Sequence, residues 1–351
     1  MNAQIDTSVV DFSVLAAWMD AQGLGEGALT NVDRLRGGTQ NVLLRFSRSG
    51  RDYILRRPPP VLRASSNVAM LREVRVLNAI ATSDVPHPRL IAACEDPDIL
   101  GGAVFYLMEP VEGFSATAGL PPRHAADPMI RNRMGFALVE GLAKLHAVDH
   151  VAVGLDGFGK PEGYLERQVD RWLAQLDSYA KFSAWPGPDG LPGVKAVADW
   201  LRSNVPPQGA PGIVHGDYQL GNVLYRPDGP ELAAIGDWEL ASIGDPLVDL
   251  GWIVATWHGS EKPDLPVLRV DPWDGFPGSQ DLIGHYARFS RRDLTHIEWY
   301  VVLACFRLGI ILEGTFARAC CGQAPMETGR LLNDAAVGLF MRAANRIGGT
   351  G

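Results

Sequence analysis

The sequence predicts an α+β protein of two lobes: a small N-terminal lobe with an antiparallel sheet and one packed helix, and a larger, mainly α C-terminal lobe. At 351 residues the chain exceeds the size at which one hydrophobic core stops growing. Strand-like apolar runs gather before residue 110, and helical periodicity dominates from residue 129. We therefore expect lobes at 1–110 and 111–351, a hinge at about 108–113 and a cleft between them.

The first element is a predicted β-hairpin within residues 32–57. Two apolar runs rich in β-branched and aromatic residues are separated there by the turn signal Ser49-Gly50. Ahead of the first run, Gly37 and Gly38 form an elbow whose backbone amides could approach an anion. A Gly-Gly pair is also an ordinary turn, so both interpretations stay open.

A helix is expected from about residue 67 to 81, after good N-cap residues at 65–67. Glu73 shares one helical stripe with Val76, Leu77 and Ile80, so its carboxylate is turned towards the apolar side. An isolated buried carboxylate is costly, which predicts a basic partner. Arg56 is the nearest candidate on a strand. The pair would belong either to a functional site or to an ordinary interior ion pair.

Further elements follow in order along the chain. An apolar strand is expected from Val104 to Met108, leading into Glu109-Pro110-Val111 and a linker at about 113–128. Apolar residues at three- and four-residue spacings predict helices within 129–205. The segments 182–194 and 260–280 contain many turn residues.

Composition limits the possible partners. The net charge of −8 disfavours a nucleic-acid partner, because such binding depends on Lys and Arg neutralising phosphates. The net negative charge would suit a cationic substrate, but a modest negative charge also commonly serves only to keep a protein in solution. We find no segment with the ~18 apolar residues of a membrane span, and no signal peptide. A cytoplasmic protein without a membrane partner is the expectation, with the four cysteines as buried thiols.

The residues that indicate chemistry lie between 212 and 239. Asp217 and Asn222 are five positions apart in a short polar loop between apolar runs, so both could face one cavity. One would accept a proton and the other would supply a neutral metal ligand. The apolar run 232–235 then leads to Asp237, which would complete an oxygen site for Mg²⁺ beside Asn222.

These residues carry a family resemblance. The HGDxxxxN run from His215 to Asn222, followed by an xxDxE pattern ending at Glu239, resembles the aminoglycoside phosphotransferase-like family, which has the protein-kinase-like fold. The segments YILRRPPP, REVRVLNAI, CEDPDILGGAVFYLMEPVEG, GYLERQVDRW and LGIILEGTFAR look like the subgroup that also occurs fused to acyl-CoA dehydrogenases. The resemblance spans about residues 30–320. It implies an ATP- and Mg²⁺-dependent small-molecule kinase with an alcohol as acceptor, such as a hydroxyacyl-CoA or related hydroxy acid.

The resemblance implies roles for the catalytic residues. Asp217 matches the aspartate that orients the substrate hydroxyl and accepts its proton. Asn222 and Asp237 match the metal ligands, while Glu239 could approach a second metal or cap the next turn. His215 matches a residue that mainly supports the catalytic loop through hydrogen bonds.

The resemblance also implies a nucleotide site in the N-terminal lobe. Arg56 stands where the fold normally carries a lysine that contacts phosphates and pairs with a helix glutamate, here Glu73. Arginine can bind phosphate but differs in shape, which puts the geometry in question. The carbonyl of Glu109 and the N–H of Val111 would bond the adenine edge. Gly37 and Gly38 would cover the phosphates.

The tripeptide Ile-Gly-Asp occurs twice, ending at Asp237 and at Asp245. Asp245 precedes a proline and lacks the apolar strand that delivers Asp237, so we assign the metal to Asp237. Asp245 and Asp249 are expected to hold the catalytic loop through hydrogen bonds.

The acceptor pocket is expected in the helical lobe. The candidate residues are Arg167, Trp172, Tyr300, Arg307 and Glu313. Exposed arginines such as Arg167 and Arg171 would suit a CoA diphosphate, although a solvated helix face is the alternative.

Two other functions stay open: an aminoglycoside or other antibiotic kinase, and a nucleotide-binding pseudokinase. Retention of Asp217, Asn222 and Asp237 argues against a pseudokinase, whereas Arg56 points towards one. The partner is expected to be a small-molecule substrate, and monomer and homodimer remain equally open.

Overall fold

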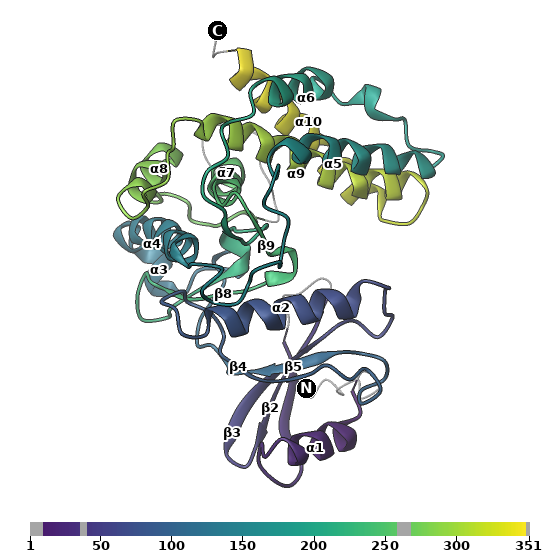
Figure 1. Ribbon diagram of the computed structural model, residues 1–351, viewed down its shortest axis with the longest axis vertical. Helices are drawn as coiled ribbons and strands as arrows, with labels where there is room; N and C mark the ends of the chain where they lie inside the picture. The colour runs from purple at the N-terminus through teal and green to yellow at the C-terminus, as the bar shows by residue number, and fades with distance from the viewer. Residues whose placement is uncertain (1–9, 36–40, 258–267, 349–351) are drawn as a thin grey trace.

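The computed structural model describes residues 10–35, 41–257 and 268–348. It confirms the α+β class: a five-stranded sheet with helices lies at one end, and a larger helical part lies at the other (Figure 1). The sheet is antiparallel, with spatial order β1-β2-β3-β5-β4. Its strands are β1 Thr30–Arg34, β2 Val42–Arg48, β3 Arg51–Arg57, β4 Leu90–Cys94 and β5 Phe105–Met108.

The predicted hairpin is confirmed as β2 and β3. Their register runs from Val42 opposite Arg57 to Arg48 opposite Arg51. The two turn residues, Ser49 and Gly50, both have positive φ, at 49° and 76°. Such turns follow the right-handed twist of the paired strands, which is why this dipeptide closes a hairpin.

The two faces of the sheet pack against different helices. Tyr53, Leu55, Phe105 and Leu107 belong to a core shared with α1 (Phe12–Ala21). The alternate residues of β3 and β5 face α2 (Ser66–Ile80) and join the core that continues into the helical part. Because side chains alternate along a strand, Arg56 and its cross-strand partner Tyr106 lie on the α2 face. The sequence predicted α2 but not α1, β1 or β4.

Helix α2 connects the sheet to the helical part, and it lies between them in Figure 1. Arg72 donates hydrogen bonds to the carbonyl oxygens of Phe158 and Ala241, at 3.2 and 2.9 Å. Its guanidinium carbon also lies 4.0 Å from the centre of the Phe158 ring. Arg75, one turn later, donates to the Asp156 carbonyl oxygen at 2.9 Å. Two arginines of one helix thus hold α2 on loops of the helical part.

The C-terminal part contains helices at the predicted positions and beyond them. Two short sheets, formed by β6 with β9 and by β7 with β8, support the loops that carry the polar residues. The remaining elements are α3 Pro122–Ala126, α4 Pro128–Ala147, α5 Glu166–Asp177, α6 Val194–Ser203, β6 Gly212–Val214, β7 Val223–Tyr225, β8 Leu232–Ile235, β9 Ser242–Gly244, α7 Leu247–Thr256, α8 Ser279–Ala287, α9 Ile297–Cys320 and α10 Met326–Gly348.

Helix α9 corrects one expectation about membrane segments. Within the described ranges it is the one helix long and apolar enough to cross a membrane by length and composition. Yet 78% of its apolar window is buried against other parts of the protein. The core helix of a soluble protein passes the same test, so length and composition do not distinguish a core helix from a membrane span.

Candidate active site

A buried aspartate fixes the backbone of the loop that follows β6. Asp249, in the first turn of α7, accepts hydrogen bonds from the N–H groups of His215 and Gly216, at 2.6 and 2.9 Å. Gly216 has φ +88°, and a Cβ there would lie 2.7 Å from the carbonyl oxygen of Leu240, so the position requires glycine. The expected role of Asp249 in holding this loop is confirmed.

Asp245 behaves differently from the prediction. Its oxygens accept hydrogen bonds from the N–H of Leu247 and the hydroxyl of Tyr300, at 3.0 and 2.8 Å. It therefore ties the start of α7 to α9 and makes no hydrogen bond to the loop at 215–222 within the described residues. Its sequence neighbour Pro246 places it at the N-terminus of α7, where a short acceptor satisfies a free N–H.

The carboxylate of Asp217 receives several hydrogen bonds from side chains around the loop. Its carboxylate accepts hydrogen bonds from Asn222 Nδ2 at 2.8 Å, from Trp252 Nε1 at 2.9 Å and from Gln219 Nε2 at 3.1 Å. Burial raises the pKa of Asp217, while the positive charge of Arg307 and the hydrogen bonds from Asn222 and Gln219 act in the opposite direction. Three donors therefore support an ionised carboxylate in a site that removes it from water.

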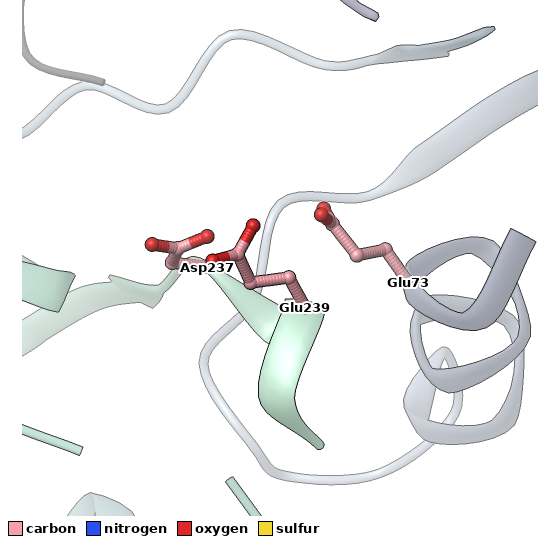
Figure 2. Close-up of side chains that lie close together, drawn as sticks. All are labelled: Glu73, Asp237 and Glu239. Atoms are coloured by element: carbon pink, nitrogen blue, oxygen red, sulfur yellow. The ribbon is translucent and has the colours of Figure 1, made fainter. Parts of the chain in front are cut away.

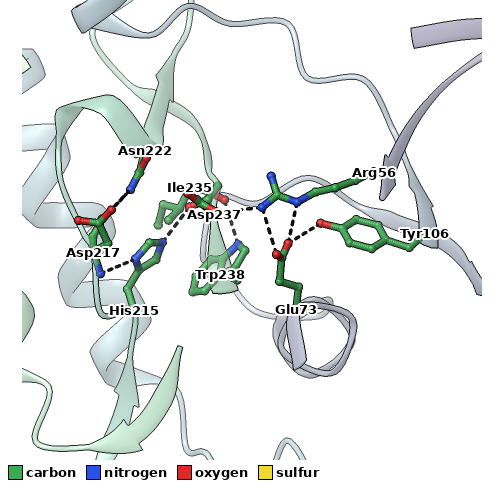
Figure 3. Close-up of polar contacts among 10 residues, drawn as sticks. Arg56, Glu73, Tyr106, His215, Asp217, Asn222, Ile235, Asp237 and Trp238 are labelled. Carbon is green, nitrogen blue, oxygen red and sulfur yellow. Dashed lines mark hydrogen bonds and ion pairs between the residues drawn. The ribbon is translucent and has the colours of Figure 1, made fainter. Parts of the chain in front are cut away.

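Both ring nitrogens of His215 are engaged by backbone groups of the site. Its ring is fully buried, with Nε2 2.8 Å from the carbonyl oxygen of Gly236 and Nδ1 3.2 Å from the backbone N of Asp217 (Figure 3). These partners require a neutral imidazole that donates from Nε2 and accepts at Nδ1. The histidine thus joins the loop of Asp217 to the end of the strand that carries Asp237.

Asp237 follows β8, as predicted from its apolar run. It is one of three non-glycine residues with positive φ in the described chain, at 63°. The N–H of Gly236 donates to the carbonyl oxygen of Asn222 at 2.8 Å, which fixes the two segments side by side. Because the amide nitrogen of Asn222 bonds Asp217, its oxygen Oδ1 is left as the available ligand atom.

Asp237 is one of three carboxylates that lie close together. Ligand oxygens of Glu73, Asp237 and Glu239 all lie within 4.8 Å of one another (Figure 2). Burial, with the nearby charges of Asp237 and Glu73, raises the pKa of Glu239 to about 7. A hard divalent cation prefers oxygen ligands, and it relieves the repulsion between neighbouring carboxylates. Asp237 and Glu239, two of the predicted ligands, therefore lie in a cluster that fits Mg²⁺, and the third member of the cluster is Glu73.

Arg56 links this cluster to the sheet. Its Nε lies 2.9 Å from Glu73 Oε2, and its Nη2 donates to Glu73 Oε1 at 3.0 Å and to Asp237 Oδ1 at 2.8 Å. Tyr106 donates its hydroxyl to Glu73 at 2.9 Å (Figure 3). Burial raises the pKa of Glu73, and Arg56 opposes that shift. The predicted Arg56–Glu73 pair is confirmed, and its extension to Asp237 was not foreseen.

The expected nucleotide contacts are only partly described. Glu109 and Val111 follow β5, and neither the carbonyl oxygen of Glu109 nor the N–H of Val111 makes a hydrogen bond within the described residues. Both groups are thus available to a ligand. The side chain of Glu109 pairs with Arg51 at 2.9 Å. Gly37 and Gly38 lie outside the described residues.

The five residues proposed for the acceptor pocket separate into two groups. Arg307 and Trp172 lie near Asp217: the Arg307 guanidinium carbon is 4.4 Å from the ring centre of Trp252 and 5.1 Å from that of Trp172. The other three are already engaged. Tyr300 is buried on Asp245, and Arg167 donates to backbone carbonyls of the loop before its own helix.

Glu313 is the clearest correction. It is 1% exposed, and its two oxygens accept hydrogen bonds from Trp185 Nε1 and Asn333 Nδ2, at 2.6 and 2.7 Å. A carboxylate satisfied on both oxygens inside the helical part is a structural group. The sequence pattern of an apolar helix could not distinguish it from a pocket residue.

Two residues of the site were not foreseen. Gln219 and Trp252 both donate to Asp217. The sequence contained a signal for Trp252, since it stands three residues after Asp249 and thus on the same side of α7.

Fold and site together define a phosphotransferase of the kinase-like class. Residues 31–276 match the model of the phosphotransferase enzyme family, and the chain belongs to that family. A Ralstonia eutropha protein, provisionally assigned as an aminoglycoside phosphotransferase, superimposes with a TM-score of 0.78 at 29% identity, covering 96% of this chain and 99% of that chain. A thermostable mutant of aminoglycoside phosphotransferase APH(4)-Ia, in ternary complex with AMP-PNP and hygromycin B, shares the fold alone. Its TM-score is 0.60 at 15% identity, covering 95% of this chain and 98% of that chain.

Curated relatives confirm the narrower resemblance. Acyl-CoA dehydrogenase family member 11 of Gallus gallus is 31% identical over 86% of this chain, and member 10 of Mus musculus is 30% identical over 83%. The chain covers 38% and 27% of those proteins, so it spans about a third of their length.

Proposed function

We propose that the protein is an ATP- and Mg²⁺-dependent small-molecule kinase that transfers the γ-phosphoryl group to a substrate hydroxyl. The observation that carries this proposal is the pairing of Asp217 with Asn222 at 2.8 Å, joined through His215 to the strand end that bears Asp237. A base and a set of oxygen ligands on two adjoining loops are what phosphoryl transfer requires. A nucleotide-binding scaffold has no need of the complete set.

Each group has a role in the proposed reaction. Asp217 accepts the proton of the acceptor hydroxyl while that oxygen forms a bond to the γ-phosphorus and ADP departs with the electrons of the broken P–O bond. Trp252 and Gln219 hold the carboxylate in place. Bound Mg²⁺ would neutralise phosphate charge, with Asn222, Asp237 and Glu239 as its protein ligands.

The nucleotide side follows from the same geometry. Glu109 and Val111 offer one acceptor and one donor to an adenine edge, and Arg56 stands beside the carboxylate cluster where phosphates would lie. Structural neighbours of the same fold were solved with AMP-PNP and with ADP, which supports a nucleotide site in this protein. We propose residues 108–113 as the hinge between lobes at 1–110 and 111–351.

Two acceptor classes compete. A hydroxyacyl-CoA or related hydroxy acid is favoured by the relatives, which are acyl-CoA dehydrogenase family members. An aminoglycoside is the second candidate, because a structural neighbour of the same fold was solved with hygromycin B.

The first test is ADP release, measured by a coupled assay over hydroxyacyl-CoAs, hydroxy acids and aminoglycosides. Asp217→Asn should lower kcat by about 10²–10⁴-fold, because the substituted amide cannot accept the proton. Asp199→Asn, on the exposed face of α6, is the matched control and should behave as the wild type. Near wild-type turnover by Asp217→Asn would show that Asp217 is not the base.

A thermal-shift experiment separates the kinase from a pseudokinase. ATP with Mg²⁺ should raise Tm more than ATP alone, and a chelator should reverse the difference, because only the kinase site requires the carboxylate ligands. Absence of a Mg²⁺ effect together with absence of ADP release would leave the pseudokinase as the explanation.

A further inference from the structure

Arg307, at the centre of the site, pairs with no carboxylate among the residues that the structure describes. It projects from α9, its Nη2 donates to the carbonyl oxygen of Gly216, and its guanidinium lies between the rings of Trp252 and Trp172. Its Nε is buried and has no hydrogen-bond partner within the parts of the chain that the structure describes. By contrast, Arg56 bonds two carboxylates, and Arg72 and Arg167 each bond two backbone carbonyl groups.

Such an arrangement is unfavourable in the absence of a ligand. A buried N–H without an acceptor is destabilising, and a buried charged group without one is more so. Burial lowers the pKa of Arg307, which reflects the same loss of hydration. Buried polar atoms that remain unpaired in a folded protein are rare, so a group of them points to a missing partner.

Two more unpaired atoms lie in the same group of contacts. Trp172 Nε1 and Gln219 Oε1 are buried and have no partner among the described residues. The Trp172 ring adjoins Arg307, and the other end of the Gln219 amide bonds Asp217. Two donors and one acceptor are therefore left unsatisfied on side chains that connect to Asp217.

We infer that Arg307 and Trp172 form an oxygen-binding subsite that selects the acceptor alcohol. The Nε–H of Arg307 and the Nε1–H of Trp172 bind a carboxylate or acyl carbonyl oxygen of the acceptor. Gln219 Oε1 receives a hydrogen bond from a hydroxyl of the same molecule. This inference rests on the proposed kinase function and specifies which alcohols the site accepts.

The charges around Trp172 also disfavour polycationic acceptors. A polycationic amino sugar needs carboxylates around its ammonium groups, whereas here a guanidinium occupies the position between two indole rings. Arg171 adds a second cation, with its guanidinium carbon 5.4 Å from the centre of the Trp172 ring. Like charges brought together at a binding site disfavour the wrong ligand more strongly than neutral contacts do.

The test uses alcohols of matched chain length that carry a carboxylate, a thioester or an ammonium group at the end opposite the hydroxyl. ADP release by the full chain is measured with each. We expect kcat/KM for the carboxylate or thioester alcohols to exceed that for the ammonium alcohols by at least about tenfold. Preference for ammonium alcohols, with ADP release intact, would overturn the inference while leaving the kinase function standing. If no alcohol of any kind releases ADP, the kinase function and the inference fail together.

Variants test whether Arg307 is the residue that selects the acceptor. Arg307→Met should raise KM for the favoured acceptors by about tenfold or more and leave KM for ATP unchanged. Arg307→Lys keeps the charge but loses the Nε–H, so it should still reject ammonium alcohols while binding thioesters weakly. Arg318→Met, on an exposed position of the same helix, is the control and should not change either KM.

A purely structural role makes a different prediction. If Arg307 only supports the loop through Gly216, its loss would change kcat and the KM for ATP along with the acceptor KM, and that result would overturn the inference. Should Arg307→Met fail to fold, Trp172→Phe carries the test, because it keeps the ring and removes only the donor. An unchanged acceptor KM in Trp172→Phe, with Arg307→Lys also unchanged, would equally overturn it.

Discussion

At the scale of single residues, the site is governed by the opposition between burial and hydrogen bonding at Asp217. Burial disfavours the charge, and three side-chain donors favour it. A proton acceptor benefits from both effects, since a raised pKa increases its basicity while the donors hold its orientation.

This balance predicts a pH dependence of turnover. The pKa of Asp217 is raised by burial, and the base acts only when ionised, so kcat/KM should fall on acidification at a pH above the ordinary aspartate value of about 4. Trp252→Phe removes one donor to the carboxylate and should move this fall to higher pH. A pH–rate profile measures both. A fall at the ordinary aspartate value, unmoved in Trp252→Phe, would contradict the assignment.

Arg56 gives a prediction about stability. Arg56→Met leaves Glu73 buried with only the Tyr106 hydroxyl as partner, so the free energy of unfolding should fall by about 3–5 kcal/mol. Arg45→Met is the matched control on the neighbouring strand. Its pair with Asp52 is about 40% exposed, so the loss of that pair should lower the free energy of unfolding far less. Urea denaturation of both variants checks the difference, and equal losses would contradict it.

At the scale of helices, α7 organises the site. Its first turn supplies Asp249 to the loop backbone, and one turn later it supplies Trp252 to Asp217. The helix can do so because Gly251 lets it approach α9 closely: a Cβ there would lie 2.5 Å from the carbonyl oxygen of Tyr300. The position of the base therefore depends on a close contact between two helix backbones.

Two helical glycines should respond in opposite directions to the same change. Gly251→Ala must displace backbone and should lower the free energy of unfolding by about 1–3 kcal/mol. Gly284→Ala, in α8, meets nothing within 4 Å and should raise it by up to about 1 kcal/mol through helix propensity. Chemical denaturation distinguishes the signs. Equal effects would mean that the α7–α9 contact is looser than the structure shows.

At the scale of the whole molecule, α2 joins the two parts, and a buried network lies behind the site within the helical part. In that network His146 Nδ1 lies 2.7 Å from the Tyr286 hydroxyl, and His146 Nε2 lies 3.6 Å from Asp249, too far for a hydrogen bond. Burial lowers the pKa of His146. Asp249 and Asp245 oppose the shift, and Arg292 adds to it.

This histidine predicts how stability changes with pH. The unfolded chain binds a proton near the ordinary histidine pKa of about 6.5, and the folded protein binds it only at lower pH. Folding should therefore lose stability as pH falls below about 6.5. Thermal unfolding of the wild type and of His146→Gln over this range tests the effect, and the variant should show a weaker slope. Identical slopes would assign the effect to other groups.

Local patterns in the sequence were sufficient for several elements. The hairpin around Ser49-Gly50, the helix bearing Glu73 and the strand before Asp237 were all predicted, because turn residues and apolar periodicity act within a few positions. The pairing of Arg56 with Glu73 was predicted from the cost of burying a charge. By contrast, α1 and β4 were missed, and Tyr300 and Glu313 proved to be internal to the helical part.

The sequence by itself determined the α+β class, the family and the residues of the catalytic loop, because these depend on local order along the chain. Only the tertiary structure decided that Arg56 also holds Asp237, that Asp249 rather than Asp245 fixes the loop, and that Arg307 faces the site with no carboxylate among its described partners. Each of these contacts joins segments far apart in sequence. Which of two similar side chains makes such a contact depends on packing geometry, and packing is set by the whole fold.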